Sequence, residues 1–91
     1  DYHLFLPNVF SPNGDGNNDV LYVRGKGFQS LKFIVFDRWG NRMFESTDKE
    51  IGWDGMFNGN LVAAGVYVYY VEVEYYNGTS EIKEGNVCVT F

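Results

Sequence analysis

The sequence predicts an all-β domain, and three features of its pattern support that prediction. Apolar and polar residues alternate through residues 66–76 and 87–91, as they do in strands that bury one face. No stretch longer than a turn keeps a helical period, and no internal repeat is evident. Tight hairpin turns are indicated by adjacent asparagine and glycine residues at Gly40-Asn41, Asn58-Gly59 and Asn77-Gly78.

The order of these segments predicts how the strands are arranged. About seven segments suit strands: residues 3–10, 20–25, 30–37, 41–46, a short stretch near Trp53, residues 66–76 and the segment that ends at Phe91. Seven short strands separated by turns are the usual number for an immunoglobulin-like antiparallel β-sandwich. We therefore expect two packed sheets with one core between them.

The alternation also predicts which side chains form that core. Glu72 and Glu74 share one face of residues 66–76, so the opposite face should be buried. Residues 33–36 allow two registers, in which either Phe33 and Val35 or Ile34 and Phe36 face the core, and we expect the first. The predicted core consists of Phe33, Val35, Tyr67, Tyr69, Val71, Val73, Val87 and Val89.

Length and composition agree with one small, aromatic-rich domain spanning residues 1–91. A chain of this size buries roughly 60 to 65% of the surface that its unfolded form exposes, so its core must be dense. Eight Phe, seven Tyr and two Trp supply large side chains for such a core.

Charge and hydropathy exclude several classes of function. The net charge is −5 and the seven Lys and Arg residues are scattered, so a phosphate backbone would be repelled and no nucleic-acid partner is expected. No apolar run is long enough for a transmembrane segment. No signal peptide opens the sequence, so for an exported protein we expect the targeting signal upstream in a longer precursor.

Catalytic chemistry is not indicated. His3 is the only histidine, and the sequence places no second base or ligand beside it. Cys88 is the only cysteine, so it forms no intrachain disulfide, and its place between core valines suits a structural thiol. Glu72 and Glu74 fit the solvated face of a strand better than a catalytic pair. We therefore predict that the domain is not an enzyme.

One loop has the composition of a metal site. Asn13, Asp15, Asn17 and Asp19 stand at alternate positions with glycines between the first three, so a curled backbone could direct four side-chain oxygens at one point. Oxygen ligands of this kind favour calcium, although the spacing is not that of an EF-hand. The alternative is an Asx-rich turn whose side chains bond to nearby amides.

Two fragments, FDRWG at residues 36–40 and WDG at residues 53–55, suit turns anchored by an aromatic residue. In the first, Asp37 could cap backbone amides or pair with Arg38. The second occurs once, which excludes a propeller built from such repeats.

Four segments in chain order resemble a C-terminal domain found on surface and secreted proteins of Bacteroidota: FSPNGDGNND, FIVFDRWGNRMFES, WDG and AAGVYVYYVEV. That family is the gliding-motility-associated domain, the type B sorting domain of the type IX secretion system. The resemblance implies a β-sandwich at the end of a long precursor, exported through the periplasm to the cell surface or medium. It also implies two partners, the N-terminal passenger in the same chain and the secretion machinery with its outer-membrane proteins.

The primary hypothesis is therefore a non-enzymatic sorting domain that is recognised as a folded surface. The candidate recognition elements are the last hairpin and the exposed parts of the FDRWG turn, with Asp37, Arg38 and Trp39. The alternative is a calcium-stabilised carbohydrate-binding or adhesive module, with Tyr70 and Tyr76 as a stacking platform.

Overall fold

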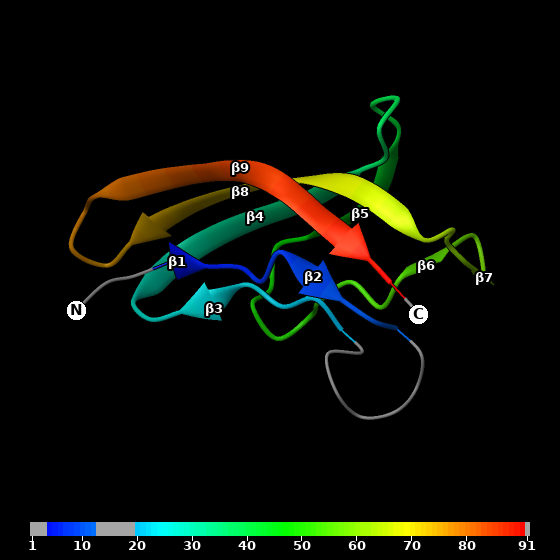
Figure 1. The fold of residues 1–91 in the computed structure, drawn as a ribbon. Coiled ribbons are helices and arrows are strands. Elements are labelled where there is room, and N and C mark those ends of the chain that lie inside the picture. The colour runs from blue at the N-terminus through cyan, green and yellow to red at the C-terminus, as the bar shows by residue number, and fades with distance from the viewer. Residues whose placement is uncertain (1–3, 13–19, 91) are drawn as a thin grey trace.

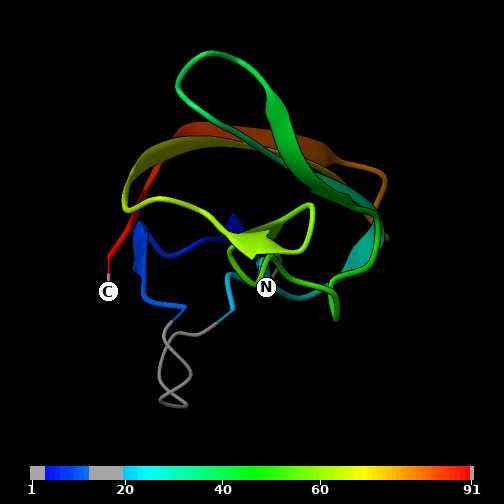
Figure 2. The same cartoon turned by 90° about the vertical axis from the view of Figure 1, so that its right-hand side faces the viewer.

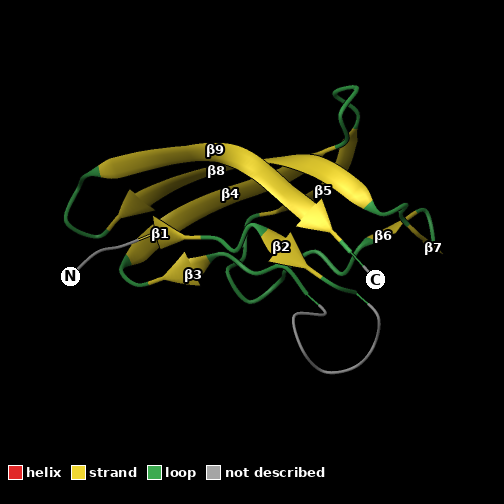
Figure 3. Cartoon of the chain, in the orientation of Figure 1, coloured by secondary structure: helices red, strands yellow, loops and turns green. Residues whose placement is uncertain are grey.

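A computed structural model describes residues 4–12 and 20–90, and every regular element in these ranges is a β-strand (Figures 1 and 3). The predicted all-β sandwich is therefore confirmed. The strands are β1 (Leu4–Phe5), β2 (Val9–Phe10), β3 (Arg24–Gly25), β4 (Phe28–Phe36), β5 (Arg42–Ser46), β6 (Met56–Phe57), β7 (Asn60–Leu61), β8 (Gly65–Tyr75) and β9 (Ser80–Val89).

The main sheet contains five strands in the order β2-β9-β8-β4-β5. Strands β8 and β9 form its longest hairpin, with Gly65 opposite Val89 and Glu74 opposite Ser80. The predicted turn lies between them, where Gly78 adopts a φ of 88°. Every pair in this sheet is antiparallel except β2 and β9, which run parallel.

The second layer lies beneath this sheet and is less regular (Figures 1 and 2). It comprises the pair β1-β3, the hairpin β6-β7 and a single bridge between Leu21 and Trp53. The β6-β7 turn has positive φ at both central residues, 53° at Asn58 and 81° at Gly59, as a tight hairpin requires. Pro7 interrupts the segment between β1 and β2, because proline cannot donate to a ladder of hydrogen bonds.

All eight residues of the predicted core are buried, so the period of two was assigned correctly. Ile34, the alternative considered in β4, is also buried although it lies on the opposite face, because β5 and β8 flank it on both sides. Phe36 is half-buried.

Trp53 joins the two layers. Its indole is 0% exposed and packs against Phe10 and Tyr67, with ring centroids 5.3 and 5.4 Å away. Its Nε1–H donates to the carbonyl of Met56 at 3.2 Å. Gly52 allows the backbones to approach here, since a Cβ at this position would lie 2.5 Å from the Leu21 carbonyl oxygen. The WDG fragment is therefore a structural anchor.

Candidate functional site: the turn between β4 and β5

The turn between β4 and β5 is organised by one carboxylate. Asp37 Oδ1 accepts hydrogen bonds from the backbone N–H groups of Trp39 at 2.9 Å and Asn41 at 2.8 Å. Its Oδ2 accepts a third bond from the Asn41 side-chain amide at 2.9 Å. The backbone closes the same loop, because Asp37 N–H donates to the Asn41 carbonyl at 2.9 Å. The prediction that Asp37 caps the amides of this turn is confirmed.

These bonds favour the charged form of the carboxyl group. The pKa of Asp37 is lowered below its usual value, chiefly by the Asn41 side-chain amide, while partial desolvation opposes the shift. Backbone N–H groups of Asn41, Trp39 and Gly40 add to the lowering. Because the pKa is lower in the folded state, the ionised carboxylate stabilises the fold at pH values above the pKa of an unfolded aspartate. This contribution is lost as the pH falls through the folded-state pKa.

Replacing Asn41 with alanine should raise the pKa of Asp37 towards its usual value, because the side-chain amide that chiefly lowers this pKa disappears. An NMR titration of the Asp37 carboxyl resonance measures this change. Asn86→Ala is the matched control, since Asn86 is exposed on β9 and should leave the Asp37 pKa unchanged. An unchanged midpoint in Asn41→Ala would show that the backbone amides alone set the pKa.

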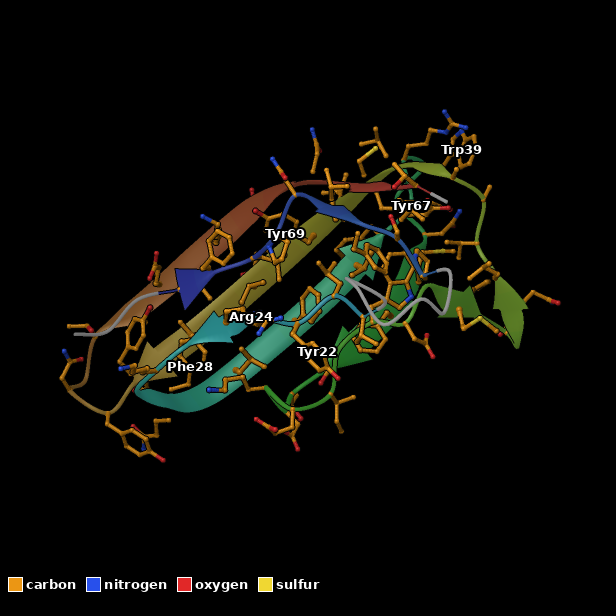
Figure 4. All side chains as sticks on the ribbon, turned by 60° about the horizontal axis from the view of Figure 1, so that its bottom comes forward. Tyr22, Arg24, Phe28, Trp39, Tyr67 and Tyr69 are labelled. Carbon is orange, nitrogen blue, oxygen red and sulfur yellow. The ribbon has the colours of Figure 1, made fainter. Side chains whose placement is uncertain are left out.

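The turn presents Trp39 to solvent. Its side chain is 74% exposed and lies at the periphery of the molecule in Figure 4. The Arg38 guanidinium lies over the indole, 4.6 Å from the ring centroid. Stacking of this kind holds both side chains in a defined arrangement. Asp37, Arg38 and Trp39, the predicted recognition residues, are thus brought together on one projecting turn.

Two hollows adjoin the Trp39 side chain. A smaller one of about 120 Å³ is lined by residues 37–39 and by residues 63–67, where β8 begins. A larger one of about 360 Å³ lies towards the β6-β7 hairpin and is lined by Phe57 and Leu61 among others. Both of these apolar side chains are partly exposed. Sequence reasoning missed their contribution, although apolar residues flanking the Asn58-Gly59 turn were a visible signal.

Tyr67 connects this end of the molecule with the core. It lines both hollows, its hydroxyl donates to the Ala63 carbonyl at 2.8 Å, and its ring packs against Trp53. Burial raises the pKa of its phenol, so the hydroxyl stays protonated and available as a donor. Residues 63–67, which lie beside Trp39, are therefore held in place by the contacts of Tyr67 with the core.

The remaining residues that the sequence singled out are those of the predicted calcium loop, His3 and Cys88. Asn13, Asp15, Asn17 and Asp19 lie outside the described residues, as does His3, so the calcium loop stays a prediction. Within residues 4–12 and 20–90, no group of three or more His, Cys, Asp or Glu side chains is placed to hold a metal ion. Cys88 is half-buried in β9.

The proposed sugar platform is not favoured. Tyr70 is half-buried, and its hydroxyl donates to Glu72 at 3.2 Å. Tyr76 is exposed but follows the end of β8, six residues further on. At roughly 3.4 Å per residue, six residues separate the two rings by about 20 Å, too far for one sugar to stack on both. Across the described parts of the chain, no helix has the length and apolar character to cross a membrane.

Comparison with known proteins defines the class to which this fold and site belong. The family described as CHU_C type IX secretion signal domain matches residues 4–89. The chain belongs to this family, whose members are secretion signals and not enzymes. The resemblance to a type IX sorting domain that the sequence motifs indicated is confirmed.

A solved structure shares the fold. CopC from Methylosinus trichosporium OB3b is 16% identical, with a TM-score of 0.61 over 96% of this chain and 93% of that chain. At this identity the likeness concerns the fold alone. No curated protein matches the sequence significantly.

Proposed function

We propose that this domain directs an attached passenger protein across the outer membrane to the cell surface or medium, and that the type IX machinery reads it as a folded surface. We place the contact at the turn between β4 and β5, with Trp39 as its centre and Arg38 and Asp37 beside it. Membership of the secretion-signal family supports the general role. The exposed indole of Trp39 is the observation that supports this particular surface.

The fold gives no reason to expose a tryptophan at this place. Trp39 is 74% exposed and is not a member of the hydrophobic core, whereas its backbone N–H is held by Asp37. A rigid, exposed aromatic side chain with a stacked arginine is typical of residues that dominate the binding energy of protein interfaces. Prior ordering also lowers the entropy lost when a partner binds.

Replacing Trp39 with alanine should reduce export strongly while leaving the fold intact. The expected change in unfolding free energy is within about 0.5 kcal/mol, as for other surface substitutions. The assay fuses residues 1–91 to a periplasmic reporter in a host with an intact type IX system and its outer-membrane partner. Reporter reaching the surface or medium is measured beside the melting temperature of each purified domain.

The matched control is Tyr76→Ala, which removes another exposed aromatic residue, 69% accessible and remote from the turn. It should leave export near the parent level. Arg38→Ala should give an intermediate loss, because it removes the stacked guanidinium but keeps the indole. Normal export of Trp39→Ala would place recognition elsewhere. A parent fusion that stays in the periplasm while the purified domain binds glycans would favour the adhesive module.

A further inference from the structure

The outer edge of β9 is largely unpaired among the described residues. Strand β9 pairs with β8 along its whole length, but β2 covers only Cys88 and Val89 on the other side. There the N–H groups of Cys88 and Thr90 donate to the carbonyls of Asn8 and Phe10. Because backbone groups point to alternate sides of a strand, the even-numbered residues from 80 to 86 direct theirs away from β8. This edge forms the orange part of β9 in Figure 1.

The described part of the chain does not extend the pairing along this edge, because the residues just before β2 cannot continue it. Before β2, Pro7 lacks an N–H group, and β1 pairs with β3 in the second layer. Residues 80–86 therefore offer about 20 Å of strand edge, at roughly 3.4 Å per residue. An unpaired edge of this length has the backbone donors and acceptors needed for the addition of another strand.

The side chains on this edge restrict which strand can be added. Glu81 and Lys83 lie on the inner side of β9, and Ile82 lies on the outer side with 58% of its surface exposed. The Tyr75 hydroxyl donates to Glu81 at 2.6 Å, which helps to position the carboxylate. Charges on an edge strand normally prevent pairing. An added strand must therefore place a positive group opposite Glu81 and a negative group opposite Lys83.

We propose that a second copy of this chain meets that requirement, pairing antiparallel along β9 with Ile82 opposite Ile82. In this register Glu81 of each copy lies opposite Lys83 of the other, so that two cross-strand ion pairs flank the central isoleucines. The neighbouring symmetric registers place Glu81 opposite Glu81 or Lys83 opposite Lys83. Those registers set like charges face to face, which destabilises a strand pair.

Such a dimer would join two main sheets into one without hiding the candidate recognition turn. That turn lies between β4 and β5, and β5 is the opposite edge of the sheet. The association and the proposed sorting role are therefore independent, and either can fail alone. Because strand pairing along a few residues buries little surface, the dimer should be weak and dependent on concentration.

Sedimentation velocity of the 91-residue chain over a range of concentrations tests the proposal. The parent chain should show a reversible equilibrium between monomer and dimer. Lys83→Glu and Glu81→Lys should each weaken dimerisation about tenfold or more, since both pairs become repulsive. An equimolar mixture of the two variants should recover association, because every Lys then lies opposite a Glu.

Lys32→Glu is the matched control, a charge reversal on the central strand β4 that should leave the equilibrium unchanged. Circular dichroism melting of each variant verifies that it folds. A parent chain that remains monomeric up to about 1 mM, a concentration at which even weak complexes form, would overturn the proposal. The proposed register would be wrong if either single variant dimerised as strongly as the parent chain. It would also be wrong if the mixture of the two variants dimerised no more strongly than each variant alone.

Discussion

Replacing Trp53 with alanine should lower the unfolding free energy by about 3–5 kcal/mol, the range typical of truncating a large buried aromatic residue. The indole is 0% exposed and lies between the rings of Phe10 and Tyr67. Its loss would leave a cavity between the two layers and would leave the Met56 carbonyl without its donor. Small domains are stable by only about 5–15 kcal/mol in total, so much of the stability would disappear.

Urea unfolding followed by circular dichroism measures this effect. Trp53→Phe should cost less than alanine, because a ring still fills part of the space. Trp39→Ala serves as the control, since it removes the other tryptophan from an exposed position. A loss below about 1 kcal/mol in Trp53→Ala, close to that of an average point mutation, would show that the layers pack without this anchor.

Deleting residues 85–91 from the reporter fusion should abolish export, the largest functional effect that the structure predicts. The deletion removes Val87 and Val89, both fully buried, and takes away the strand that pairs with β2 in the main sheet. It also exposes part of β8 as a new edge. Without these contacts we expect no cooperatively folded domain, and the signal is proposed to act only when folded.

The comparison with Trp39→Ala separates loss of folding from loss of recognition. The deletion should give a fusion that is neither folded nor exported, whereas Trp39→Ala should be folded but poorly exported. Protease resistance of the periplasmic fraction reports folding in both cases. Export of the truncated fusion at the parent level would show that a shorter, linear signal before residue 85 is sufficient.

The sequence predicted strands β4, β5, β8 and β9 of the main sheet well, because β4-β5 and β8-β9 are paired through local turns. Along β8 the alternation of Val71 and Val73 with glutamates assigned both faces correctly. The second layer was harder to predict, because its strands are only two residues long and its contacts join distant segments. The bridge between Leu21 and Trp53 is of this kind, and neither residue was placed in the predicted core.

The candidate site was predictable only in part. Asp37 could be expected to cap its turn, since aspartate readily bonds to amides of the following residues. Whether Trp39 anchored the core or faced solvent depended on how the hairpin projects from the sheet, which no local pattern encodes. The larger hollow beside Trp39 is lined in part by Phe57 and Leu61 of the β6-β7 hairpin, a contact between segments that are distant from the turn in sequence.

The parallel pairing of β2 with β9 makes folding of the domain depend on both of its end segments. The hydrogen bonds from Cys88 to Asn8 and from Thr90 to Phe10 span almost the entire sequence. They cannot form until residues 88–90 have left the ribosome, so a chain that stops earlier never closes this edge. A sorting signal built in this way would be read only after the whole domain, from β2 to β9, has been synthesised.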